Sequence, residues 1–142
     1  MRRGPEGAIE VAVSSLIKKL RVQPQQRMLL LNAPEGYVES LGELPEGCEI
    51  SEEAHGQYGF VHLFVRNSQD LERWLPTASD AVEYDGLFWI SYPKRSSKVE
   101  TDLTRGVLWE LMKATPYRPV TQISIDEVWS ALRFRPAERV GK

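Results

Sequence analysis

The chain has 142 residues, the length of one domain with a single hydrophobic core. Its 42% of hydrophobic and 27% of charged residues are typical of soluble globular proteins, and its net charge of −2 disfavours nucleic acid or an anionic membrane as a partner. The single cysteine, Cys48, excludes an internal disulfide and a cysteine-based zinc cluster and fits a reducing, cytoplasmic location. No apolar run approaches the ~18 residues of a membrane span, and Glu10 interrupts the N-terminal apolar stretch, so we expect neither a membrane protein nor a signal peptide.

The N-terminal third predicts a helix, a buried strand, a short helix and an edge strand. Residues 1–7 are charged and contain Gly and Pro, which predicts disorder, and the apolar spacing from Ala8 to Leu20 predicts the first helix. The apolar run Met28–Leu31 predicts a strand buried on both faces. A short helix follows at Gly36–Leu44, and Cys48–Ile50 is a weak edge strand.

The middle of the chain predicts two more buried strands with a helix between them. The first strand is Phe60–Val65, and Ser68 is then the expected N-cap of a helix that Pro76 should kink or divide. A turn at Asp85–Gly86 leads into the strand Leu87–Ser91.

The C-terminal third predicts one helix and a hairpin. The helix runs from Thr101 to Thr115, with these apolar residues inward: Leu103, Val107, Leu108, Leu111 and Met112. Residues 120–125 and 129–134 alternate as an antiparallel pair, and residues 137–142 form a flexible tail. Trp74, Trp89 and Trp109 fall on apolar faces and are expected in the core.

Strands that alternate with helices predict a single three-layer, Rossmann-like α/β domain over residues 8–136. The sheet should be mostly parallel, with the C-terminal hairpin as an antiparallel edge. This order resembles an abbreviated class I methyltransferase sheet. Residues 22–31 resemble the lead-in and first strand of those enzymes, and residues 75–91 resemble the helix and strand after their active-site strand.

The loop after the first strand departs from that resemblance. Methyltransferases place a glycine-rich loop there, so that the backbone can approach the cofactor, whereas this chain has Asn32-Ala33-Pro34-Glu35-Gly36 with one glycine. Pro34 removes a backbone donor, Glu35 adds negative charge, and no G-x-G-x-x-G or P-loop pattern occurs in the sequence. S-adenosylmethionine is therefore disfavoured, although Glu52 or Glu53 could contact a ribose.

Four motifs together resemble a bacterial family known as domain of unknown function 3052. They are LLLNAPEGY, LFVRNSQDLERWLP, LFWISYPKRSSKVETDLTR and SIDEVWSALRFRP, and the resemblance spans roughly residues 15–136. It implies a small Rossmann-like protein and carries no established activity.

A basic, serine-rich loop between the third buried strand and the next helix is a candidate anion site. Hydroxyls and ammonium groups beside a helix start can bind an anion, or they can simply form a solvated loop. The candidate residues are Lys94, Ser96, Ser97, Lys98 and Thr101.

A second candidate set lies where predicted parallel strands end, along one rim of the sheet. Glu35 could act as an acid or base if it were partly buried, Trp129 could stack on a ligand, and Asp126 could pair with Arg133 or reach the rim. The alternative is that these residues only build turns and pack against helices. The rim candidates are Asn32, Glu35, Gly36, Tyr37, Arg66, Asn67, Asp126 and Trp129.

Other chemistry has little support in the sequence. His55 and His62 have no carboxylate at ligand spacing, which disfavours a metal site, and no Ser-His-Asp set or G-x-S-x-G motif assigns a catalytic residue. Cys48 is expected to be a packing residue.

The sequence favours a non-catalytic module without a cofactor that binds a small anionic ligand or a protein partner at this rim. Two alternatives stay open. One is an S-adenosylmethionine-dependent, methyltransferase-like enzyme with a degenerate cofactor loop. The other is a structural homodimer that pairs through the hairpin of residues 120–134.

Overall fold

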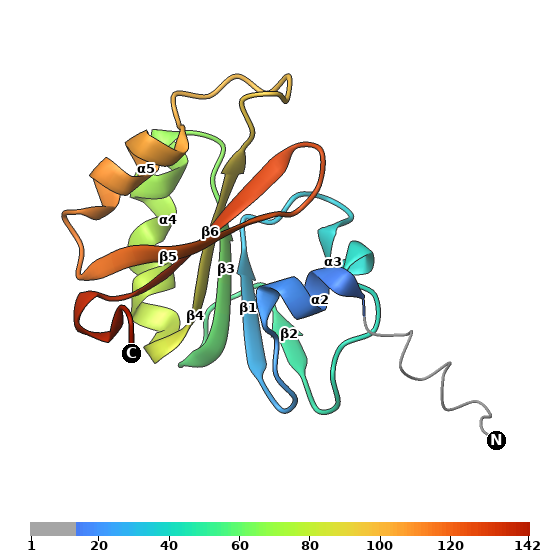
Figure 1. Cartoon of the computed structure of the whole chain (residues 1–142). Helices are drawn as coiled ribbons and strands as arrows, with labels where there is room; N and C mark the ends of the chain where they lie inside the picture. Colours follow the sequence, from blue (N-terminus) through green and yellow to red (C-terminus); the bar gives the residue numbers. More distant parts are fainter. Residues whose placement is uncertain (1–13) are drawn as a thin grey trace.

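The computed structural model describes residues 14–142, which form one six-stranded sheet with helices on both faces (Figure 1). The strands are β1 (Arg27–Leu31), β2 (Glu49–Ser51), β3 (Tyr58–Phe64), β4 (Val82–Pro93), β5 (Tyr117–Ser124) and β6 (Trp129–Pro136). The helices are α2 (Ser15–Leu20), α3 (Tyr37–Ser40), α4 (Ser68–Ala81) and α5 (Arg105–Met112), followed by the 3-10 turn η1 (Ala137–Arg139).

The strand order is β2-β1-β3-β4-β6-β5. The first four strands are parallel, and β6 runs antiparallel to both of its neighbours, β4 and β5. This topology confirms the predicted three-layer, mostly parallel α/β fold with a C-terminal hairpin. No helix among the described residues is long and apolar enough to cross a membrane.

Two hydrophobic layers cover the sheet, because successive strand residues point to opposite faces. On one face, odd-numbered residues of β1 and β3 such as Leu29 and Val61 pack with α4 and α5. On the other face, even-numbered residues such as Met28 and Phe60 pack with α2 and α3. Figure 1 shows the two helix pairs on opposite sides of the sheet.

The first helix of the described residues, α2, begins at Ser15. Ser14 is the N-cap of α2, and its hydroxyl accepts a hydrogen bond from the Ile17 amide at 3.2 Å. The predicted disorder of residues 1–7 and the predicted helical residues 8–13 lie outside the described residues.

The start of α4 corrects one prediction. Asn67, not Ser68, is its N-cap, and the Asn67 side chain accepts from the Asp70 amide at 2.9 Å. Ser68 instead bonds Asp102 through its amide and its hydroxyl. The sequence predicts that Pro76 kinks or divides this helix, and α4 runs undivided through Pro76.

The start of α5 also differs from the prediction. The helix begins at Arg105 with Thr104 as its N-cap, because the Thr104 hydroxyl accepts from the Val107 amide at 3.1 Å. Thr101 accepts from the Leu103 amide in a separate local turn. Val107, Trp109 and Leu111 are 38%, 44% and 42% exposed, so the prediction that they are buried is wrong.

The start of β4 and the C-terminal tail differ from the sequence-based prediction. The predicted turn at Asp85–Gly86 lies inside β4, where the register with β3 shifts and Asp85 has a φ of 57°. The predicted flexible tail contains η1, and Arg139 in it contacts the Asp85 carboxylate at 3.3 Å.

Candidate functional site

The point where ligands usually bind to such a sheet lies between the carboxyl ends of β1 and β3. The chain leaves β1 toward β2 on one side and returns to β3 on the other, which opens a crevice between the two strand ends. Here the Asn32 side chain spans that crevice. Its Nδ2 donates to the Phe64 carbonyl at 2.9 Å and lies 3.4 Å from an Asp70 carboxylate oxygen.

Below this contact, a buried chain of hydrogen bonds joins α3 to the two central strands. The Tyr37 hydroxyl lies 3.0 Å from His62 Nδ1, and His62 Nε2 lies 2.6 Å from the Ser91 hydroxyl. Burial lowers the pKa of His62 from 6.5 to about 3, so the ring is neutral at physiological pH. Nothing in the spacing of residues 37, 62 and 91 marks them as neighbours, so the sequence did not reveal these hydrogen bonds.

Trp129 and Asp126 lie at the turn of the β5–β6 hairpin, and Trp129 packs beside the end of β3. Trp129 is buried and packs edge-on against the Phe64 ring, at 5.2 Å between centroids. Asp126 accepts from the amides of Val128 and Trp129, both at 2.8 Å, so it builds the hairpin turn. Burial, with a smaller effect of the Asp126 charge, raises the pKa of Tyr37.

The remaining rim candidates are exposed or have structural contacts. Glu35 and Gly36 are exposed, and Gly36 has a φ of 86°, a conformation that favours glycine. The Arg66 amide donates to Asp70 at 2.9 Å, and Asn67 caps α4. The rim set therefore does not form one site: Tyr37 and Trp129 are buried, Glu35, Gly36 and Arg66 are exposed, and the others have structural contacts.

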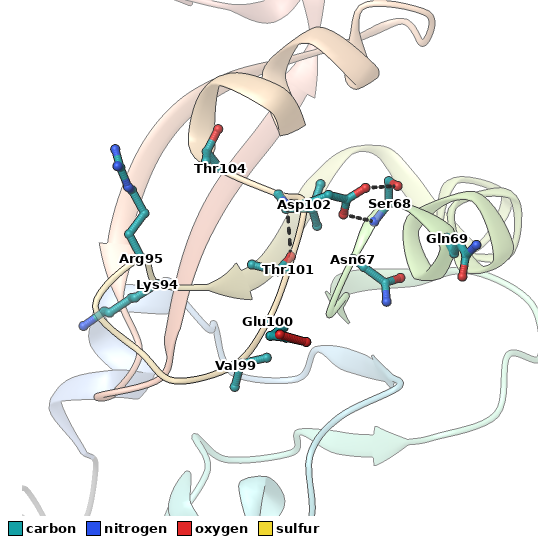
Figure 2. Close-up of a pocket in the computed structure, with 11 residues that line it drawn as sticks. Asn67, Ser68, Gln69, Lys94, Arg95, Val99, Glu100, Thr101, Asp102 and Thr104 are labelled. Atoms are coloured by element: carbon teal, nitrogen blue, oxygen red, sulfur yellow. Dashed lines mark hydrogen bonds between the residues drawn. The ribbon is translucent and has the colours of Figure 1, made fainter.

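An open cleft lies farther along the rim, beyond β3 and β4 (Figure 2). It measures about 800 Å³ and is lined by Asn67–Gln69, Lys94–Arg95 and Val99–Thr104. The hydrogen bonds from Ser68 lower the pKa of Asp102, which keeps this carboxylate charged. Figure 2 shows the Lys94 and Arg95 side chains extending away from the Ser68–Asp102 contact. With Glu100 and Asp102 in its lining, the cleft carries both signs of charge.

A smaller cavity of about 370 Å³ adjoins this cleft on the hairpin side. Lys94 and Arg95 line both spaces, and the smaller one adds Arg105, the first residue of α5. The seven described residues that line it include three cations and no carboxylate. They are Tyr92, Lys94, Arg95, Ser96, Arg105, Gln122 and Ser130.

The structure thus brings together only part of the predicted anion site. Lys94 and Ser96 line the smaller cavity, whereas Ser97 uses its hydroxyl to bond the Lys94 carbonyl at 2.7 Å. Thr101 lines the larger cleft, and Lys98 is exposed and lines neither space. Arg95 and Arg105 were missed because no spacing rule places the two arginines together.

Other candidate chemistry gains no support from the described residues. No group of three or more His, Cys, Asp or Glu in residues 14–142 could hold a metal ion. Cys48 is a free, half-buried thiol that contacts the Gln23 carbonyl at 3.0 Å and packs against the core.

Comparison of the sequence with known families and curated proteins gives no match. The resemblance to domain of unknown function 3052 therefore stays a prediction.

Several solved methyltransferase structures are similar to this chain. The DhpI–SAH complex gives a TM-score of 0.59 at 14% identity, covering 95% of this chain and 87% of that one. The ribosomal protein L11 methylase from Lactobacillus delbrueckii subsp. bulgaricus gives 0.56 at 10% identity, covering 85% and 74%. Magnesium protoporphyrin IX methyltransferase (ChlM) from Synechocystis PCC 6803 with bound SAM gives 0.50 at 10% identity, covering 96% and 81%. At these identities the likeness shows a Rossmann-like, methyltransferase-type fold.

Proposed function

We propose that this chain is a binding module on a methyltransferase-type fold, and that it holds a small anionic ligand in the 370 Å³ cavity beside β4 and α5. One observation carries the proposal. Lys94, Arg95 and Arg105 line one cavity of ligand size whose own lining contains no carboxylate, and the Lys94 ammonium donates to the Ser124 hydroxyl at 2.7 Å. Such a set of cations attracts an anion and forms charge-assisted hydrogen bonds with it.

The neighbouring groups suit the same ligand. Tyr92 and Ser130 are only 5% and 7% exposed, and their hydroxyls can donate to an anionic oxygen. Arg105 also begins α5, whose helix dipole favours negative charge at this end. The adjoining 800 Å³ cleft, with its mixed charges, has room for the polar remainder of a larger ligand.

Calorimetric titration with inorganic phosphate and sulfate tests this function. We expect saturable binding to the wild-type protein and a loss of affinity of about tenfold in Arg105→Gln, because a hydrogen bond to a charged group contributes about 1.5–3 kcal/mol. The matched control is Arg73→Gln, which removes one guanidinium from α4, outside both rim spaces. No binding, or the same loss in both variants, would contradict the proposal.

An S-adenosylmethionine-dependent methyltransferase is the second candidate. It is favoured by solved structures of this fold that contain SAH or SAM, so the expectation that no cofactor binds has no support from the comparisons. The loop after β1 also has left-handed backbone at Asn32 and Gly36, with φ values of 58° and 86°, as a glycine-rich loop would. The Asn32 side chain across the crevice argues against it.

Titration with SAH separates the two candidates. The binding module predicts that SAH does not bind at the β1 loop. The methyltransferase candidate predicts that SAH binds with micromolar affinity and that Arg105→Gln leaves this affinity unchanged. The affinity should change in Asn32→Gly, because this variant removes the side-chain amide that bonds the Phe64 carbonyl and keeps a residue suited to a φ of 58°. Such a result, followed by methyl transfer to an acceptor, would replace the first proposal.

A further inference from the structure

A separate cavity lies at the opposite end of the sheet, where the parallel strands β3 and β4 begin. It measures about 340 Å³ and is lined by Gly59, by residues 83–87 around the irregular start of β4, and by Arg133 of β6. The loop after α2 supplies the rest of the lining: Arg21, Gln23 and Gln26. This cavity shares no residue with the rim site.

Arg133 reaches this cavity with an incomplete set of partners. Its Nε is buried and has no hydrogen-bond partner in the part of the chain that the structure describes. A buried donor without an acceptor is rare and costly in folded proteins. Burial, and then the charges of Arg21 and Arg135, lower the pKa of Arg133, so its surroundings disfavour the positive charge that it carries.

The neighbouring carboxylate is already paired with other arginines. Asp85 accepts from Arg135 Nε and Nη2, both at 2.9 Å, and from Arg139 Nε at 3.3 Å. Glu83 is exposed at the edge of the cavity and forms no salt bridge with another described residue. The lining therefore holds two cations, Arg21 and Arg133, and two carboxylates, Glu83 and Asp85, of which Asp85 is already engaged by two arginines outside the lining.

We propose that this cavity binds a small carboxylate between the guanidinium groups of Arg133 and Arg21. The fork of N–H groups on a guanidinium matches the two oxygens of a carboxylate, and a carboxylate oxygen at Arg133 Nε–H would supply the acceptor that this buried donor lacks. Because Glu83 and Asp85 lie in the same lining, a singly charged carboxylate meets less repulsion there than doubly charged phosphate does.

The test follows the arginine Nε–Hε signals of ¹⁵N-labelled protein by NMR during titration with acetate. We expect the Arg133 signal to move saturably. The Arg135 signal is the internal control, because its Nε already donates to Asp85 and should not move. Inorganic phosphate, titrated in the same way, is expected to bind more weakly than acetate.

Two surface variants change the affinity in opposite directions and leave Arg133 in place, so the fold is not at risk. Arg21→Gln should weaken acetate binding about fivefold and Glu83→Gln should strengthen it about threefold, as expected for partly exposed charges. Arg105→Gln should change nothing, which separates this site from the rim. An unmoved Arg133 signal, equal movement of Arg135, or tighter binding of phosphate would each overturn the proposal.

Discussion

At the scale of single residues, the buried His62 ring makes the free energy of unfolding depend on pH. The ring is fully buried, and burial lowers its pKa from 6.5 to about 3, so only the unfolded chain takes up a proton between these values. This contribution to stability is fully present above pH 6.5 and is lost as the pH falls toward 3. Between pH 7 and pH 5 we expect His62 to remove about 2 kcal/mol of the free energy of unfolding.

Urea denaturation at the two pH values measures this effect. In His62→Gln the extra acid sensitivity should disappear, at a cost at neutral pH of about 1–3 kcal/mol, because hydrogen bonds to Tyr37 and Ser91 are weakened. His55→Gln is the control, since His55 is exposed and its removal should leave the acid sensitivity unchanged. If His62→Gln and the wild type lost the same stability on acidification, the buried neutral ring would be the wrong description.

The same scale shows what the sequence could and could not reveal about the site. Lys94 and Ser96 were predictable, because a polar loop after a buried strand is where α/β folds bind ligands. Arg105 was not, because it reaches the cavity only through the true start of α5. The contacts of His62 join residues 25 and 29 positions away, and no local pattern encodes such pairs.

At the scale of helices and strands, the start of α5 gives a direct test of capping. Thr104→Ala should destabilise the protein by about 1 kcal/mol, because the hydroxyl satisfies the Val107 amide at the first turn. Thr101→Ala should cost less, since Thr101 bonds only the Leu103 amide in the preceding loop. Chemical denaturation of both variants gives the comparison, and an equal or larger loss in Thr101→Ala would place the helix start where the sequence suggested.

The elements themselves differ in how well the sequence defines them. Buried strands such as β1 and β3 are nearly continuous apolar runs, so the sequence locates their ends to within two residues. Helix starts are harder to locate from the sequence, because Thr101-Asp102 and Thr104 both fit the pattern of an N-cap. Trp109 was misplaced for a related reason: α5 has only eight residues and buries only Leu108 and Met112.

At the scale of the whole molecule, the sheet has the strand arrangement of a methyltransferase-type fold, and the Asn32 side chain joins the ends of β1 and β3 at its centre. The alternation of strands and helices was enough to predict the sheet. The contacts of the Asn32 side chain were not predictable, because they join Asn32 to Phe64 and Asp70, which are 32 and 38 positions away in the sequence. The predicted dimer stays a prediction: β5 is an outer strand that could pair with a second copy, although Pro119 interrupts its donors.

The central claim is that an anionic ligand binds beside β4 and α5 and not at the loop after β1. Mapping backbone amide shifts of ¹⁵N-labelled protein by NMR, with phosphate and separately with SAH, tests it most directly. We expect phosphate to shift residues 94–96, Arg105, Gln122 and Ser130, and SAH to leave residues 32–37 unmoved. Saturable shifts at residues 32–37 with SAH, with none at the cavity with phosphate, would contradict the account and favour a cofactor-binding enzyme.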